Sequence, residues 1–173
     1  MDQFTEKKYF KHLSENQMQT LAHALAKSTI QNISTSSCLN VWLIGELGTG
    51  KTTFTRYFLR ALGFDGKVKS PTYGLCESYE LEIEKVLPAP LSFHHFDLFR
   101  INHPTEWVEA GFKDILTHPG ISFIEWPEKA EGTLPTPDME VKLTHLSDDL
   151  RDLEICAHSS LGSVILSNTQ LSL

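Results

Sequence analysis

The residues with the clearest chemical meaning form the segment GELGTGKT, residues 45–52. They fit the pattern G-x-x-x-x-G-K-[ST], in which the backbone N–H groups of a glycine-rich turn surround phosphate oxygens. Gly45 and Gly50 permit backbone angles and a close approach that a side chain would hinder. Lys51 is placed to reach the outer phosphates, and the hydroxyl of Thr52 is placed to bind Mg²⁺. The segment therefore predicts a site for a nucleoside triphosphate and its metal ion.

The segments on both sides of this turn predict the elements that must hold it in place. LNVWLI, residues 39–44, is an almost continuous apolar run, which is typical of a parallel strand covered on both faces. After the turn, apolar residues recur with helical spacing as far as Leu62, and Gly63 is well placed to end the helix. A helix N-terminus carries partial positive charge, so this strand–turn–helix order favours anion binding.

A bound metal ion also needs an acidic partner, and two strand-like segments end in one. Asp97 ends SFHHFD, and Glu125 ends ISFIE after an unbroken apolar run. Burying either carboxylate is costly without a cation or hydrogen-bond donors, so we expect at least one to face Mg²⁺, directly or through water. His94 and His95 do not extend this set to a histidine-rich metal centre, because adjacent strand residues point to opposite faces and only His95 shares a face with Asp97.

Other segments carry weaker signals for secondary structure. Ser14 and Gln17 form a capping box that predicts a helix over residues 14–27, followed by a polar loop at 28–37. Pro104 favours the start of a short helix. Apolar or alternating runs predict strands at residues 75–81, 91–99 and 121–126, and an antiparallel hairpin built from 139–146 and 151–159.

This order of elements predicts an α/β fold. We expect a three-layer P-loop NTPase-like architecture, with a central mixed sheet that has a parallel core and antiparallel strands and is flanked by helices. The length of 173 residues favours one domain over residues 1–173.

Composition narrows the class of function. The formal net charge of −7 argues against a broad nucleic-acid-binding face. The three cysteines are far apart, which disfavours a disulfide framework or a zinc site. The N-terminus lacks the apolar region of a signal peptide, and no run approaches the ~18 apolar residues of a membrane span. We therefore expect a cytoplasmic protein with no membrane association.

Four motifs together resemble those of one family. GELGTGKTT, VKSPTYGL, HFDLFR and IEWPEK, in this order and spacing, resemble the TsaE family, also called YjeE. The resemblance runs from about Leu13 to Gly162. It implies an ATPase that uses ATP and Mg²⁺ and supports formation of threonylcarbamoyladenosine (t6A) at adenosine 37 of tRNA. It also implies an association with the TsaB–TsaD pair, which transfers the threonylcarbamoyl group, and a contact with tRNA that is mainly indirect through the complex.

The resemblance also implies roles for individual residues. Lys51, Asp97 and Glu125 match residues needed for catalysis, and Thr52 and Glu125 match the metal site. Asp97 matches a second functionally important acid, and the choice of direct Mg²⁺ ligand between it and Glu125 stays open. A switch-like segment near the γ-phosphate is matched by Ser70, Pro71, Thr72 and Tyr73. The nucleotide site is matched by Leu47, Gly48, Thr49, Gly50, Lys51, Thr52 and Thr53, with adenine contacts near residues 12–14 and Arg151.

Alternative functions share the same phosphate-binding motif. A small-molecule or nucleoside kinase usually has a lid with several arginines, but only Lys113 and Lys129 are basic between Pro104 and Glu131. A GTP-dependent switch would need an N-K-x-D motif, which the sequence lacks. A third alternative is a scaffold that binds nucleotide as a signal but hardly hydrolyses it. This alternative differs from the ATPase hypothesis only in the rate of hydrolysis. No arginine in the sequence is clearly placed as an arginine finger, which would stabilise charge on the phosphate during hydrolysis. We therefore expect ATP hydrolysis by the isolated protein to be weak and to be controlled by its partners.

Overall fold

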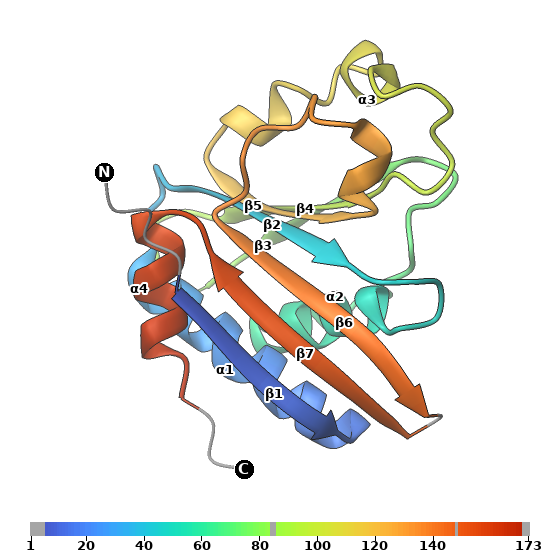
Figure 1. The fold of residues 1–173 in the computed structure, drawn as a ribbon. Coiled ribbons are helices and arrows are strands. Elements are labelled where there is room, and N and C mark those ends of the chain that lie inside the picture. Colours follow the sequence, from blue (N-terminus) through green and yellow to red (C-terminus); the bar gives the residue numbers. More distant parts are fainter. Residues whose placement is uncertain (1–5, 84–85, 148, 171–173) are drawn as a thin grey trace.

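A single mixed sheet forms the centre of the protein. The computed structural model describes residues 6–83, 86–147 and 149–170. Its strands are β1 (Glu6–Leu13), β2 (Cys38–Ile44), β3 (Cys76–Leu81), β4 (Leu91–Asp97), β5 (Gly120–Glu125), β6 (Met139–Ser147) and β7 (Leu150–Ala157). They form a seven-stranded sheet in the order β1-β7-β6-β2-β5-β4-β3 (Figure 1). Neighbouring strands from β6 to β4 pair in parallel, whereas β3, β7 and β1 join by antiparallel pairing, so the predicted mixed sheet is confirmed.

Helices cover both faces of the sheet and make three layers. One face packs against α1 (Glu15–Asn32), α2 (Lys51–Ala61) and α4 (Ser160–Asn168). The other face of β2, β5 and β4 is covered by residues 98–119 and 126–135, which contain the short helix α3 (Glu106–Glu109) and the 3₁₀ helices η1 (Ile115–Thr117) and η2 (Pro127–Ala130) (Figure 1). Each face of the sheet has its own buried apolar cluster, because successive side chains along a strand point to opposite faces. Within the part of the chain described above, no helix combines the length and apolar character that crossing a membrane requires.

The predicted N-terminal helix is present but longer than expected. Its capping box is formed as predicted, because the Ser14 hydroxyl accepts from the backbone N–H of Gln17 at 3.3 Å and the Gln17 side chain accepts from the Ser14 N–H at 3.0 Å. The prediction of a loop from Ser28 is wrong, since α1 continues to Asn32. The buried hydroxyls of Ser28 and Thr29 donate to the carbonyls of Ile165 and Leu25, which makes these polar residues compatible with a buried helical turn.

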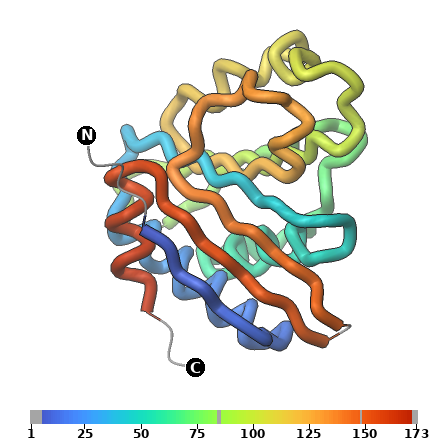
Figure 2. The backbone as a smooth tube through the Cα atoms, viewed as in Figure 1, coloured from blue at the N-terminus to red at the C-terminus, as the bar shows by residue number. Residues whose placement is uncertain are grey.

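The predicted strands lie where the apolar runs indicated, and the hairpin is confirmed by the antiparallel register of β6 and β7. Asp148, in the turn predicted between them, lies outside the described residues. The helix expected at Pro104 is short and begins at Glu106. Sequence patterns did not predict β1 or α4, which lie side by side at the edge of the molecule (Figure 2). A Ser167–Glu6 hydrogen bond of 2.6 Å links them.

Candidate active site

The glycine-rich loop, residues 45–50, joins β2 directly to the N-terminus of α2. Gly45 has φ 154°, and a Cβ atom there would lie 2.5 Å from the Leu143 carbonyl oxygen. Gly50 has φ 102° and forms the N-cap of α2 without a side-chain hydrogen bond to the first turn. The first turn of α2 therefore receives no side-chain cap from Gly50, and its N–H groups lie at the end of the helix that carries partial positive charge and favours anions.

The Lys51 side chain lies along this loop. Its ammonium donates to the carbonyls of Gly45 at 2.6 Å and Glu46 at 2.9 Å, and it lies 4.0 Å from the ring centre of Trp126. Burial lowers the pKa of Lys51 from its ordinary value. Nearby carboxylates oppose that shift, in decreasing order Glu125, Glu128 and Asp97. The loop thus holds a desolvated cation beside the open helix N-terminus, where it would attract an anion strongly.

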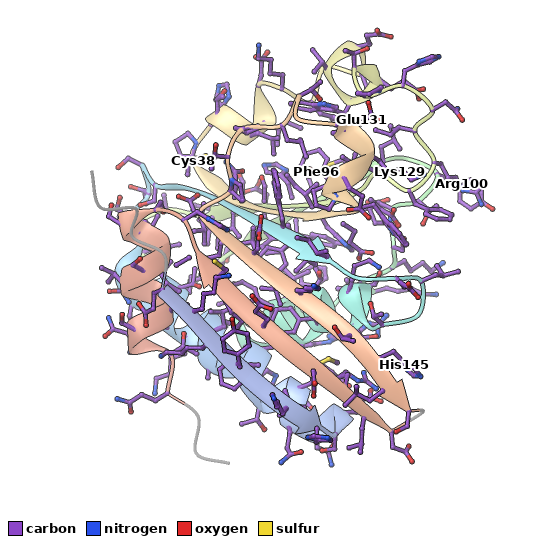
Figure 3. The ribbon with its side chains drawn as sticks, viewed as in Figure 1. Cys38, Phe96, Arg100, Lys129, Glu131 and His145 are labelled. Atoms are coloured by element: carbon purple, nitrogen blue, oxygen red, sulfur yellow. The ribbon has the colours of Figure 1, made fainter. Side chains whose placement is uncertain are left out.

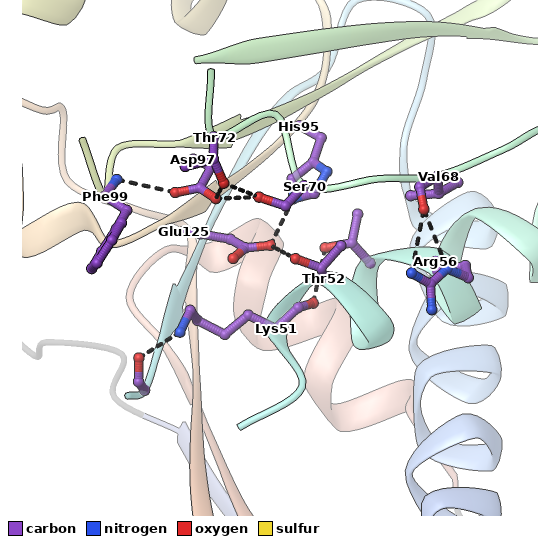
Figure 4. A network of polar contacts seen from close by, with 12 residues as sticks. Lys51, Thr52, Arg56, Val68, Ser70, Thr72, His95, Asp97, Phe99 and Glu125 are labelled. Carbon is purple, nitrogen blue, oxygen red and sulfur yellow. Dashed lines mark hydrogen bonds and ion pairs between the residues drawn. The ribbon is translucent and has the colours of Figure 1, made fainter. Parts of the chain in front are cut away.

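Glu125 faces Thr52 across the end of the parallel sheet. The Thr52 hydroxyl donates to Glu125 Oε1 at 2.7 Å, and His95 Nε2 lies 2.8 Å from the same oxygen (Figure 4). Glu125 and His95 are both buried. The structure therefore brings together the two residues that the sequence proposed for the metal site, at the carboxyl ends of parallel strands, where α/β proteins bind ligands.

Asp97 lies beside Glu125 in register but bonds to a different part of the chain. Its Oδ2 accepts hydrogen bonds from the hydroxyls of Ser70 and, at 2.7 Å, of Thr72. Its Oδ1 accepts from the backbone N–H of Phe99 at 3.0 Å. Both oxygens of Asp97 are thus used by segments adjoining the cleft, and Ser70 and Thr72 attach their segment to the end of β4 (Figure 4).

An open cleft of about 500 Å³ connects these groups. Sequence-predicted residues that line it are Leu47, Gly48, Gly50, Lys51, Thr52, Thr53, Ser70, Thr72, Asp97 and Glu125. Thr49 is not among the lining residues, because its hydroxyl donates to the Glu46 carbonyl at 2.9 Å and supports the loop from inside. Pro71 is buried, and Tyr73 is 87% exposed with the Arg100 guanidinium 4.5 Å from its ring centre.

Arg151 lies under the glycine-rich loop and does not line this cleft. A Cβ atom on Gly50 would be 3.2 Å from Arg151 Nη1, so the guanidinium is close to the N-cap of α2. Arg151 is buried, donates to the Met18 sulfur at 3.7 Å, and its Nε has no partner among the described residues. It pairs with Leu13 across β7 and β1, so it lies near the segment 12–14 to which the resemblance assigned adenine contacts.

His95 and Trp126 were not assigned a role from the sequence. His95 contacts Glu125, and Trp126 covers Lys51. Phe99 and Arg100 also line the cleft. Trp126 adopts the left-handed conformation, φ 59° and ψ 47°, immediately after β5. Figure 3 shows Arg100 on the same side of the molecule as Lys129, at the segment that covers the second face of the sheet. His95 and Asp97 are two positions apart on one strand, so their side chains lie on the same face. This spacing was the signal that could have placed His95 near the site.

Oxygen ligands are the chemistry that Mg²⁺ prefers, and the site offers them. The Thr52 hydroxyl and the Glu125 carboxylate are adjacent, with a second carboxylate at Asp97. Among residues 6–83, 86–147 and 149–170, no three His, Cys, Asp or Glu side chains converge as a metal site. Mg²⁺ in phosphate-binding sites needs only one or two protein carboxylates, because phosphates and water complete its shell. The donor set therefore fits Mg²⁺ bound together with a phosphorylated ligand.

Fold and site together define an α/β protein in which a glycine-rich loop joins a buried parallel strand to a helix, opposite two strand-end carboxylates. The chain belongs to the TsaE family, because the family model described as "Threonylcarbamoyl adenosine biosynthesis protein TsaE" matches residues 12–153. The resemblance noted from the sequence motifs is thereby confirmed.

Individual proteins support this membership. The tRNA threonylcarbamoyladenosine biosynthesis protein TsaE of Haemophilus influenzae is 40% identical over 135 residues, covering 78% of this chain and 80% of the relative. The protein of the same name from Rickettsia felis is 32% identical over 153 residues, covering 88% of this chain and 81% of the relative. The crystal structure of YdiB from Bacillus subtilis superposes with a TM-score of 0.73 at 19% identity, covering 97% of both chains, which supports the fold.

Proposed function

We propose that this protein binds and hydrolyses ATP with Mg²⁺ as a cytoplasmic subunit of the machinery that forms t6A on tRNA. The observation that carries the proposal is the single cleft shared by Lys51, the open N-terminus of α2, and the Thr52–Glu125 pair. The names of the TsaE relatives supply the biological context, since each refers to tRNA threonylcarbamoyladenosine biosynthesis.

The phosphate chain would be bound by the glycine-rich loop and Lys51. The N–H groups at the start of α2 donate to phosphate oxygens, and the Lys51 ammonium exchanges the Gly45 and Glu46 carbonyls for the outer phosphates. Thr52 and Glu125 would hold Mg²⁺, which when bound neutralises charge on the phosphates. Arg151 is buried next to Gly50, and its Nε has no hydrogen-bond partner among the described residues. Its guanidinium would contact the nucleoside part of ATP.

Asp97 would act on the attacking water and couple hydrolysis to the segment 70–73. Ser70 and Thr72 both donate to Asp97, so the carboxylate and the two hydroxyls form one unit at the edge of the cleft. A γ-phosphate that attracts these hydroxyls would release Asp97 to accept a proton from water. Tyr73, exposed next to this unit, would carry the change to the surface.

The TsaB–TsaD pair would control this reaction by docking at the cleft. Arg100 lines the cleft, and its guanidinium lies over the ring of Tyr73, which is itself exposed. A partner that rearranges Arg100 and Tyr73 would complete the charge stabilisation that hydrolysis needs. Contact with tRNA would then be mainly through the partners, which agrees with the net charge of −7.

The test is reconstitution of t6A formation with TsaB–TsaD, a threonylcarbamoyl donor and tRNA over many turnovers. Wild-type protein should sustain repeated turnover, and Lys51→Ala should fail and lose ATP affinity by about 100-fold or more, as expected when a buried charge-assisted contact is removed. Lys27→Ala, on the exposed side of α1, is the matched control and should behave as wild type. Equal turnover without the protein, or phosphate transfer to a metabolite in place of release to water, would contradict the proposal.

A further inference from the structure

We infer that His95 is a positioning residue for Glu125, and that the metal-dependent part of nucleotide binding depends on it. His95 would touch neither metal nor nucleotide; its Nε2–H holds one oxygen of the carboxylate so that the other faces the cleft. This inference rests on the function proposed above and names the residue that prepares its metal site.

The geometry of the contact is fixed by the sheet. His95 lies on β4 two residues before Asp97, on the strand face that also carries Phe93, and it is fully buried. Its Nε2 is 2.8 Å from Glu125 Oε1 on the neighbouring strand β5. Because an ionised carboxylate can only accept, the imidazole must carry its hydrogen on Nε2. The ring is therefore a donor with one defined acceptor.

Core packing alone does not explain a histidine at this position. His95 Nδ1 is buried and has no hydrogen-bond partner among the residues that the structure describes. A buried polar atom without a partner destabilises the folded state, whereas a leucine of similar size would leave no such atom. The bond to Glu125 is the compensating gain, and it is made to a carboxylate that lines the cleft.

Two elements together define the orientation of Glu125. Thr52, at the start of α2, and His95, inside β4, both contact Oε1 and approach it from different elements. A carboxylate held by one donor can rotate, whereas two donors on rigid elements restrict it. Donors that orient a metal ligand typically change metal affinity by 10–100-fold when removed. His95 is therefore expected to influence metal affinity and not phosphate binding.

The experiment measures two affinities for each variant: a non-hydrolysable ATP analogue in EDTA, and Mn²⁺ in the presence of that analogue, by electron paramagnetic resonance. His95→Leu should lose Mn²⁺ affinity by about 10–100-fold while analogue affinity in EDTA is unchanged. His95→Gln, whose amide can still donate, should retain most of the Mn²⁺ affinity. His94→Leu is the matched control, since His94 points away from Glu125 and lies 2.8 Å from the Ser78 hydroxyl.

A double-mutant cycle separates positioning from a general structural effect. In a Glu125→Gln background, His95→Leu should cause no further loss of Mn²⁺ affinity, because the group it orients has been removed. An equal loss in both backgrounds, or wild-type Mn²⁺ affinity in His95→Leu, would overturn the inference. If His95→Leu does not fold, the Mn²⁺ affinities of His95→Met and His95→Gln are compared instead. Failure of the wild-type protein to bind the analogue in EDTA would instead refute the proposed function.

Discussion

The ends of β4 and β5 lie side by side and each carries a buried carboxylate, yet different kinds of structure hold the two. Glu125 is bonded to Thr52 on a helix and to His95 inside a strand. Asp97 is bonded to Ser70 and Thr72, which belong to an irregular segment before β3. Adjacent acids in one sheet are therefore held differently, Glu125 by regular elements and Asp97 by a loop.

We propose that this difference gives the two acids different tasks. Loops open at lower free energy than packed helices and strands, so contacts to a loop can change without loss of the fold. On this proposal the Asp97 end would respond to a ligand or a partner, whereas the Glu125 end would keep its geometry. A switched hydrolysis would use both properties, a constant metal site and an adjustable group that acts on water.

The largest effect should come from exchanging each acid for its amide. Asp97→Asn should reduce single-turnover ATP hydrolysis by about 10²–10⁴-fold, because a group that accepts a proton is removed, while Mg²⁺-dependent binding persists. Glu125→Gln should weaken the Mg²⁺-dependent binding itself. Rapid-quench hydrolysis and nucleotide titrations with and without Mg²⁺ measure the two effects. If Asp97→Asn lost metal-dependent binding and Glu125→Gln kept it, the two roles would be reversed.

Cys76 can test whether the Asp97 side of this comparison moves. It begins β3, just after the segment that bonds Asp97, and burial raises the pKa of its thiol to about 11. At pH 8 the reactive thiolate should be about 100-fold less abundant than for a thiol with the ordinary pKa of 9.0, so alkylation should be slow.

Mg²⁺–ATP should change the alkylation rate of Cys76 if the segment before β3 moves. Cys156, in β7 and remote from this segment, provides the control in the same molecule. Mass spectrometry after timed iodoacetamide treatment measures both sites. An identical rate at Cys76 with and without nucleotide would argue that the Asp97 side is as rigid as the Glu125 side.

Removing the hydroxyls at Ser70 and Thr72 isolates Asp97 from the loop. The double variant Ser70→Ala/Thr72→Val should lower the free energy of unfolding by about 1–3 kcal/mol, since a buried carboxylate loses two donors. It should also make hydrolysis less sensitive to TsaB–TsaD. Urea unfolding and partner titration test these outcomes, with Ser78→Ala as a control on the exposed part of β3. Full stimulation by the partners would rule out the coupling.

The smallest effect concerns Lys51 and pH. Since burial lowers its pKa in the folded protein, the unfolded chain binds more protons between that lowered pKa and the ordinary 10.5. Stability contributed by this group must therefore rise with pH across that window. At pH 7, nucleotide-free Lys51→Met should be at least as stable as the wild-type protein. As the pH approaches 10.5, the free energy of unfolding of the wild-type protein should rise relative to that of Lys51→Met. Urea titrations at several pH values measure the difference; the opposite slope would contradict it.

Sequence alone anticipated the parts that depend on neighbouring residues. The spacing of Gly45 and Gly50 between an apolar strand and an amphipathic helix predicted the loop, and the strand-end acids were recognised from their position in the chain. These features are local, because backbone angles and hydrophobic period are encoded within a few residues. For the same reason Gly63, with φ 86°, ends α2 as predicted.

Tertiary structure decided what depends on residues far apart. β1 becomes a strand because it adds to the edge of β7, and the last turn of α1 persists because Ser28 finds the carbonyl of Ile165 in α4. Likewise, only the packed sheet shows that Asp97 bonds the segment 70–72 while Glu125 bonds Thr52 and His95. The Thr72–Asp97 and Ser28–Ile165 hydrogen bonds join residues that are 25 and 137 positions apart in the sequence. Such bonds depend on strand register and packing, which no local pattern contains. The sequence by itself determined which chemical groups are present, and the fold decided how each of them is held.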